Sequence, residues 1–209
     1  MSPKTDTQSK PGTRERLLQA AILLVRRMGF TATTVDDLCR EAQVTKGAFF
    51  HHFQTKEELG VEAARYWSSW TGGLFESAVY HLIPDPLERI LGYLDLREAL
   101  LDGPVEAFTC FAGTTVQECF ATSEPIRAAC AESITGHAST LEEDFELALE
   151  HLGGAAGATA ESLALHTQAV LQGAFVLAKA TGGAAIVRES IAHLRRYLQL
   201  LLTPPERRT

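Results

Sequence analysis

The stretch FTATTVDDLCREAQVTKGAFFHHFQTKEEL, residues 30–59, contains three threonines that each precede a run with helical periodicity. Thr34, Thr45 and Thr55 are predicted N-caps, because a threonine hydroxyl can accept a hydrogen bond from the first backbone N–H groups of a helix. A glutamate three residues after the last of them completes a capping-box pattern. The stretch therefore predicts two short helices, joined by about two residues, and then the start of a longer helix.

The second short helix, expected from Lys46 to Phe53, has two different faces. Phe49 and Phe53 are four residues apart, so they share one face and are expected to pack on the preceding helices. The opposite side combines a cation, a residue without a side chain, an aromatic ring and an imidazole: Lys46, Gly47, Phe50 and His51, with His52 beside them. Such a surface suits close approach to a DNA groove, and two short helices of this kind outline a helix-turn-helix.

Two other interpretations of this helix were considered. Adjacent residues on a helix point about 100° apart, so His51 and His52 are not expected to hold one metal ion together. Phe50 could alternatively pack under the helix that follows. Only the second alternative stays open from the sequence.

Helical periodicity continues along almost all of the chain. Thr13 is the predicted cap of a first helix that ends near Gly29, and the helix after Thr55 is expected to run to about His81. Breaks containing glycine or proline separate five further helices, over 86–101, 109–120, 124–152, 160–180 and 184–202. We therefore expect an all-α protein of about nine helices without strands.

Charge and composition narrow the class of protein. Residues 1–56 carry nine Lys and Arg against five Asp and Glu, a net charge of +4, whereas the rest carries −11. The basic end is predicted to meet an anion, although a solvated basic face would give the same excess. No apolar run approaches the roughly 20 residues that cross a bilayer, and the polar amino terminus lacks the centre of a secretion signal. We expect a cytoplasmic protein without membrane contact.

Catalytic and metal-binding motifs are missing from the sequence. The cysteines at 39, 110, 119 and 130 have no CxxC spacing, so free thiols are expected rather than a zinc site. The histidines of the larger half have no HxxxH or HExxH spacing, and there is neither a nucleophile elbow nor a glycine-rich phosphate loop. The sequence therefore predicts no enzyme, no cofactor and no metal site.

Residues 14–59 closely resemble the DNA-binding domain of the TetR family of bacterial transcriptional repressors. The matching pieces are Gly29-Phe30, Thr33-Thr34, Val44-Thr45-Lys46-Gly47, Phe50-His51-His52-Phe53 and Lys56 to Leu59. The resemblance implies a homodimer, joined through the last two helices, that binds a palindromic double-stranded operator and is released by a small effector. It implies a disordered arm at 1–12, a helix-turn-helix domain at 13–57, an effector-binding and dimerisation domain at 58–203 and a tail at 204–209.

The resemblance also assigns roles to residues of the helix-turn-helix. Those implied to contact the DNA backbone are Thr34, Thr45, Phe50, His52 and Lys56, with Thr33 beside them, and those implied to face base edges are Lys46, Gly47, Ala48 and His51. The family usually has tyrosine at the position of Phe50, and its hydroxyl reaches a phosphate. Phenylalanine lacks this hydrogen bond, which is worth about 0.5–1.5 kcal/mol, so we expect DNA binding to survive.

Ten residues of the larger half are predicted to line an effector pocket: Trp67, Trp70, Phe75, Phe108, Cys110, Phe111, Thr114, Gln117, Phe120 and His137. An aromatic wall with few polar groups suits an apolar or aromatic ligand, although these side chains could also be plain core. Small residues along the penultimate helix, Ala169, Gly173, Ala174 and Ala178, indicate a dimer seam, with internal packing as the alternative.

Two other functions stay open from the sequence. Cys110 beside a ligand cavity could react with an electrophile or oxidant, which would give a thiol-based regulator of the same fold. No Lys or Arg lies close to it in the sequence, which favours an inert thiol. The second is an all-helical ligand-binding protein without DNA recognition, for which the change at Phe50 and the net charge of −7 are the arguments.

Overall fold

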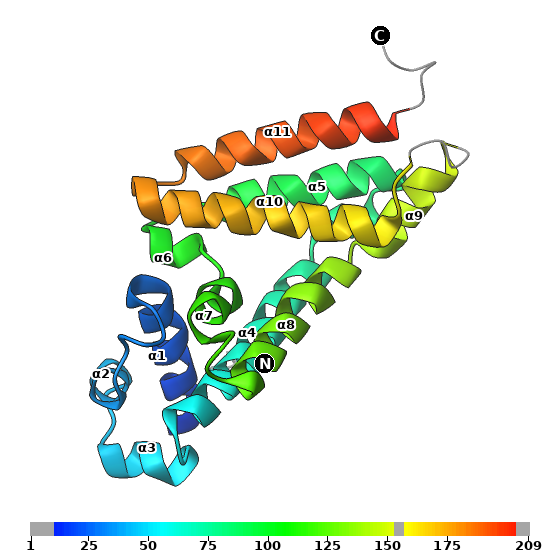
Figure 1. Cartoon of the computed structure of the whole chain (residues 1–209). Helices are drawn as coiled ribbons and strands as arrows, with labels where there is room; N and C mark the ends of the chain where they lie inside the picture. Colours follow the sequence, from blue (N-terminus) through cyan, green and yellow to red (C-terminus); the bar gives the residue numbers. More distant parts are fainter. Residues whose placement is uncertain (1–10, 153–156, 204–209) are drawn as a thin grey trace, which may run out of the picture.

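The computed structural model describes residues 11–152 and 157–203, and over these ranges it is all-α. Figure 1 shows α1–α3 at one end, α5 and α9–α11 at the other, and α4 and α8 running between them. The elements are α1 (Thr13–Met28), α2 (Val35–Glu41), α3 (Lys46–His52), α4 (Lys56–Glu76), the 3-10 helix η1 (Val79–Leu82), α5 (Pro86–Ala99), α6 (Val105–Phe108), α7 (Phe111–Cys119), α8 (Glu124–Ser139), α9 (Glu142–Glu150), α10 (Ala160–Thr181) and α11 (Ala185–Leu202).

The predicted fold class is confirmed, with eleven α-helices in the described ranges instead of about nine. Most of the predicted arm and the whole tail, including the proline pair at 204 and 205, lie outside the described residues.

Three of the four predicted threonine caps are confirmed. The hydroxyl oxygens of Thr34, Thr45 and Thr55 each accept a hydrogen bond from the backbone N–H three residues later. Thr13 is the first helical residue instead, after the N-cap Gly12, which has no side chain to offer. The carboxylate of Glu58 reaches back as expected, but to the N–H of Gln54 rather than to that of Thr55.

Several predicted helix boundaries are wrong. α4 ends at Glu76, five residues early, and the segment expected as one helix over 109–120 begins at Phe111 after two extended residues. The segment over 124–152 divides into α8 and α9 at Thr140 and Leu141. Leu141 is 1% exposed and lies in the hydrophobic core, so packing sets this break in a sequence without glycine or proline there.

Two separate hydrophobic cores support the two ends of the molecule. The first joins α1–α3 to the amino-terminal part of α4 and to residues of α7 and α8 such as Phe111 and Ile126. The second joins α5, α9, α10 and α11 to the other ends of α4 and α8, through residues such as Phe75 and Phe145. Because α4 and α8 contribute to both cores, they connect the two ends mechanically.

Candidate functional site

The inward face of α3 is anchored as its spacing predicts. Phe49 and Phe53 are 0% and 1% exposed, and their ring centroids are 5.9 Å apart. They belong to the same core as Leu38 of α2 and Leu17 of α1. This packing fixes the rotation of α3 and so determines which residues face solvent.

The outward face of α3 carries the residues expected there. Lys46, Gly47 and His51 are exposed, and Phe50 is 55% exposed, with its ring edge-to-face against Phe49 at 5.1 Å between centroids. Packing of Phe50 under α4, the alternative from the sequence, does not occur. We call Lys46, Gly47, Phe50 and His51 the exposed face of α3.

The cation of this face is paired across the turn. Lys46 Nζ lies 2.8 Å from Asp36 Oδ1 of α2, and this hydrogen bond, with the charge of Asp36, raises the pKa of Lys46. Both side chains are more than half exposed, so the pair is weak and a phosphate group can compete for the ammonium. Lys46 therefore stays charged and available at the surface.

Thr33 and Lys56, two of the residues predicted to contact DNA, lie outside the exposed face of α3. Thr33 is 1% exposed and its hydroxyl donates to the carbonyl oxygen of Gly29 at 2.7 Å. The ammonium of Lys56 donates to the carbonyl oxygens of Phe30 and Thr33, both at 3.0 Å, and lies 4.6 Å from the Phe30 ring centroid. Both side chains are committed to the turn between α1 and α2, which they hold in place from behind the exposed face of α3.

The same turn is also held from the larger half of the chain. The carboxylate of Glu118 on α7 accepts hydrogen bonds from the backbone N–H groups of Phe30 at 3.2 Å and Thr31 at 2.8 Å. Arg26 of α1 donates to the carbonyl oxygen of Ala107 in α6 at 3.0 Å, and Arg27 pairs with Glu106 at 3.1 Å. The α6–α7 segment is thus joined to α1 and to the turn before α2 by several hydrogen bonds and an ion pair.

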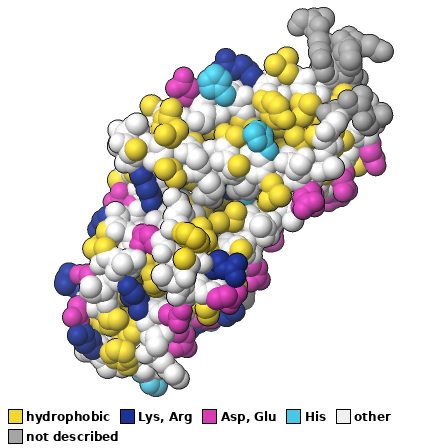
Figure 2. All heavy atoms as spheres, viewed as in Figure 1, with side chains coloured by type: hydrophobic (Ala, Val, Ile, Leu, Met, Phe, Trp, Pro, Cys, Tyr) yellow, Lys and Arg dark blue, Asp and Glu magenta, His cyan; other side chains and the backbone are white. Residues whose placement is uncertain are grey.

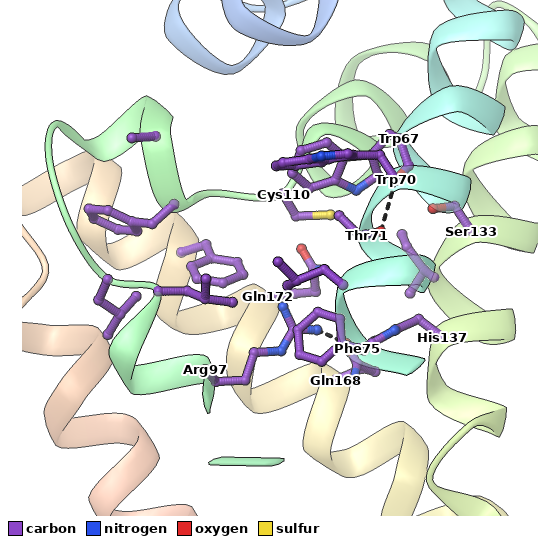
Figure 3. A pocket seen from close by; sticks show the side chains of 17 residues that line it. Trp67, Trp70, Thr71, Phe75, Arg97, Cys110, Ser133, His137, Gln168 and Gln172 are labelled. Carbon is purple, nitrogen blue, oxygen red and sulfur yellow. Dashed lines mark hydrogen bonds between the residues drawn. The ribbon is translucent and has the colours of Figure 1, made fainter. Parts of the chain in front are cut away.

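A cavity of about 180 Å³ lies behind this segment, between α4, α5, α6, α8 and α10 (Figure 3). Six of the ten predicted effector residues line it: Trp67, Trp70, Phe75, Phe108, Cys110 and His137. In Figure 3 the two tryptophans and Cys110 lie toward one end, and Phe75, Arg97, His137 and Gln168 toward the other. Apolar and aromatic side chains therefore form most of the cavity wall, and Arg97, His137 and Gln168 form a polar group at one end.

The other four predicted pocket residues do not line the cavity. Phe111 is fully buried in the first core, and Phe120 is 63% exposed. Gln117 is exposed, and the hydroxyl of Thr114 accepts a hydrogen bond from Lys179 at 2.6 Å. These four side chains therefore lie in the first core, at the surface or against α10.

Several polar side chains that line the cavity were not predicted, above all those of Arg97, Gln168 and Gln172. Arg97 has a signal in the sequence, since it follows Ile90, Tyr93 and Leu94 at helical spacing and interrupts an apolar stripe of α5. The cavity therefore has more polar side chains in its wall than the sequence predicted.

These polar groups form a hydrogen-bonded network centred on Tyr93. Its hydroxyl oxygen accepts from Arg97 Nε at 2.8 Å and from Gln168 Nε2 at 3.0 Å, and it lies 3.0 Å from His137 Nε2. Arg97 Nη2, which can only donate, lies 2.6 Å from the same imidazole nitrogen. That nitrogen is then an acceptor and the imidazole is neutral. Burial, and then the charge of Arg97, lower the pKa of His137 to about 3.

Cys110 has surroundings that its sequence neighbours do not reveal. Its Sγ accepts a hydrogen bond from the N–H of Gly113 at 3.3 Å, at the start of α7. Arg26 and Lys179 lie within electrostatic range of the thiol, so the fold supplies the cations that are absent nearby in the sequence. The other three cysteines are buried, whereas Cys110 is partly exposed.

The outer surface of α10 and α11 carries exposed apolar side chains: Leu165, Val176, Leu177, Tyr197 and Leu200. Figure 2 shows hydrophobic side chains gathered over these two helices. The four small residues expected along one side are divided, since Ala174 and Ala178 are buried in the second core while Ala169 and Gly173 are exposed. Internal packing therefore explains two of them.

Within the described ranges, no group of three or more His, Cys, Asp and Glu side chains is placed to hold a metal ion. None of the helices there is long and apolar enough to cross a bilayer.

A capped helix-turn-helix with an exposed second helix, attached to a helical body with its own core and cavity, defines the helix-turn-helix class of DNA-binding proteins. The family model described as bacterial regulatory proteins, tetR family, matches residues 17–63. The amino-terminal region of the chain is therefore similar to the DNA-binding domain of the TetR family.

Two relatives show the same similarity. The HTH-type transcriptional repressor KstR2 of Mycolicibacterium smegmatis is 34% identical over 88 residues, which are 42% of this chain and 42% of that protein. The HTH-type transcriptional regulator LmrA of Bacillus subtilis is 27% identical over 132 residues, 63% of this chain and 70% of that protein. The chain thus spans less than half the length of the KstR2 repressor that it matches.

Solved structures extend the similarity to the whole fold. E. coli NemR in its reduced form has a TM-score of 0.75 and 24% identity, covering 93% of this chain and 99% of that one. A TetR-family regulator from Agrobacterium tumefaciens has a TM-score of 0.75 and 20% identity, covering 91% and 98%. At these identities the likeness concerns the fold alone.

Proposed function

We propose that this protein is a ligand-responsive transcriptional repressor that binds a palindromic operator as a homodimer. The observation that carries the proposal is the exposed face of α3, held outward by the burial of Phe49 and Phe53. The proposal places the protein in the cytoplasm and assigns it no catalytic role.

In this proposal the exposed face of α3 enters the major groove. Lys46, Gly47, Ala48 and His51 face base edges, and the phosphate contacts come from Thr34, Thr45, Phe50 and His52. Ala48 and His52 are half-buried, which supports roles for them at the margin of the proposed contact surface. Thr33 and Lys56 support the turn behind it instead of touching DNA.

The dimer is proposed to form through α10 and α11. Their exposed leucine, valine and tyrosine side chains would otherwise face water, and burying apolar surface is the main driving force for association. Gly173 and Ala169 lie exposed on α10, where a partner helix can approach closely. The two-fold axis of such a dimer accounts for a palindromic operator, whose half-sites lie about one helical turn apart.

Ligand response is proposed to act through the α6–α7 segment. This segment lines the cavity with Ala107, Phe108 and Cys110, and it holds the helix-turn-helix through Glu106 and Glu118. A ligand that displaces the residues of this segment on the cavity wall would also move its contacts to the helix-turn-helix. The ligand must bind the arrangement that cannot engage DNA more tightly, since equal affinity for both arrangements shifts nothing.

The decisive experiment is a selection of bound duplexes from random DNA with the full-length protein. We expect a palindromic site whose affinity falls steeply as salt rises, because each phosphate contact releases counterions. Selection of no sequence in any salt would contradict the proposal and favour a helical ligand-binding protein without DNA recognition.

Gly47→Ala is expected to stabilise the protein and weaken operator binding. In the free protein a Cβ at Gly47 meets nothing closer than Thr45 Oγ1 at 3.8 Å, so alanine fits and favours the helix by about 0.5–1 kcal/mol. In the complex the added methyl keeps α3 from the base edges, and we expect about a tenfold loss of affinity, equivalent to about 1.4 kcal/mol.

Thermal unfolding and operator titration of the same preparation measure both effects. Gly136→Ala on α8 is the matched control, since Gly136 is helical and exposed with nothing within 4 Å of the added Cβ. It should stabilise the protein equally and leave the operator affinity unchanged. An operator affinity that is unchanged in Gly47→Ala would contradict the proposal that α3 enters the major groove.

A second candidate is a regulator that senses electrophiles through Cys110, favoured by its place on the cavity wall near Arg26 and Lys179. Iodoacetamide, from which a thiolate displaces iodide, is expected to label Cys110 before the three buried cysteines of the described ranges. Mass spectrometry identifies the site, and operator titration measures the consequence. This candidate would be excluded if labelling of Cys110 left the operator affinity unchanged. It would also be excluded if iodoacetamide still lowered the operator affinity of Cys110→Ser.

A further inference from the structure

Arg97 brings a positive charge to the cavity wall that no carboxylate in the described ranges neutralises. The acidic residues nearest to it on α5 pair with other arginines, Asp95 with Arg195 and Glu98 with Arg188. Asp144 of α9 pairs with Arg89. Taking a charge out of water is costly unless a partner compensates it, so an unneutralised guanidinium in a cavity wall favours an anionic ligand.

The groups that do contact Arg97 are neutral. Nε donates to the hydroxyl of Tyr93, and Nη2 lies 2.6 Å from His137 Nε2, which is an acceptor. The imidazole is neutral at physiological pH because burial and Arg97 lower its pKa to about 3. No hydrogen bond from Nη1 is found to the described residues, so two strong donors stay free for a ligand.

The guanidinium is also fixed in orientation. Its central carbon lies 4.3 Å from the ring centroid of Phe75 and 5.1 Å from that of Tyr93. Stacking on aromatic rings suits the planar guanidinium and leaves its edge for hydrogen bonds. The charge is therefore held in place before a ligand arrives, so little ordering cost falls on binding.

The rest of the cavity is small and largely apolar, although Thr71, Ser133 and Gln172 also line it. Trp67 and Trp70 lie at the end away from Arg97 (Figure 3), and Leu74, Phe108 and Phe175 contribute further apolar surface. The volume of about 180 Å³ is comparable with the roughly 150 Å³ cavity that holds one benzene molecule in another protein. One aromatic ring and a small anionic group match this space.

We propose that the cavity binds a small aromatic monocarboxylate, with its carboxylate on Arg97 and its ring between Phe75 and the two tryptophans. A carboxylate presents two oxygens to the guanidinium, and one uncompensated cation matches one negative charge. This inference rests on the proposed function only in that it names the class of ligand that the regulator senses.

The test uses the intrinsic fluorescence of the full-length protein, whose two tryptophans, Trp67 and Trp70, both line the cavity. Benzoate and phenylacetate are titrated beside their neutral isosteres benzamide and phenylacetamide. We expect each acid to bind at least about tenfold more tightly than its amide, the effect of one charge-assisted interaction. Equal affinities for acid and amide, or no response to either acid, would overturn the inference.

Variants assign the preference to Arg97. Arg97→Gln is expected to bind acid and amide equally, and Arg97→Lys to keep part of the preference because it keeps the charge. Arg127→Gln is the control, since Arg127 is exposed on α8 and, among the described residues, pairs only with Glu124. A preference for the acid that persists in Arg97→Gln would contradict the assignment. If the preference is lost, circular dichroism of the variant tests whether it is still folded.

Operator titration of the same preparations separates this inference from the proposed function. Operator binding without any response to the acids refutes the ligand class and leaves the regulator. Acid binding that depends on Arg97 in a protein that selects no DNA supports the ligand class and refutes the regulator.

Discussion

Phe49→Ala is expected to destabilise the first core by about 3–5 kcal/mol and to abolish operator binding, the usual cost of truncating a fully buried phenylalanine. Phe49 is 0% exposed and contacts the rings of Phe50 and Phe53. The exposed face of α3 is oriented by this single side chain and Phe53, because α3 has only seven residues and buries no other side chain. Without it, α3 loses its docking on α1 and α2.

The neighbouring residue provides the matched control. Phe50→Ala removes the same atoms from a side chain that is 55% exposed, so we expect little change in the free energy of unfolding. Urea unfolding measures the stability, and limited proteolysis locates any loosening in α1–α3. A loss of stability in Phe50→Ala equal to that in Phe49→Ala would contradict the orientation of α3 described above.

Arg89→Met is expected to destabilise the second core by about 3–5 kcal/mol, because it leaves the carboxylate of Asp144 buried without its charge partner. Arg89 Nε lies 2.6 Å from Asp144 Oδ1, and the two side chains are 15% and 13% exposed. Nη1 also donates to the carbonyl oxygens of Ile83 and Pro84, both at 3.0 Å. One arginine thus joins α5, α9 and the segment after η1.

An exposed ion pair serves as the control for the effect of burial on the free energy of unfolding. Arg127→Met breaks the pair with Glu124 on α8, whose side chains are 53% and 71% exposed, and should cost about 0–1 kcal/mol. Urea unfolding of both variants at one protein concentration gives the comparison. Equal losses in the two variants would mean that the Arg89–Asp144 pair contributes no more than a surface contact.

The helix-turn-helix was largely predictable because its signals are local. A threonine cap lies within three residues of the N–H that it binds, and the spacing of Phe49 and Phe53 defines a face within one turn. The resemblance to the TetR family added residue roles, and two of them, at Thr33 and Lys56, do not match the places of these side chains. Only the folded chain brings the carbonyl groups of the α1–α2 turn to the Lys56 ammonium.

The cavity was predictable only in its aromatic part. Aromatic side chains in amphipathic helices are expected to turn inward, and six of the ten residues do reach the cavity. The other four lie on α7 or directly after it and do not reach the cavity. No glycine or proline marks the division between α8 and α9 at residues 140 and 141. At the polar end His137 of α8 was predicted, whereas Arg97 of α5 and Gln168 of α10 were not, because only the folded chain brings these helices together there.

The sequence by itself determined that the chain is helical, where its first helices begin and which side of α3 faces outward, because hydrogen bonds and side-chain periodicity within a few residues fix these properties. The tertiary structure alone decided that Arg97 lies without a carboxylate partner beside Phe75, that Arg26 and Lys179 approach Cys110, and that Glu118 holds the turn before α2. These contacts join residues tens of positions apart, so their electrostatics depend on packing that no local pattern encodes.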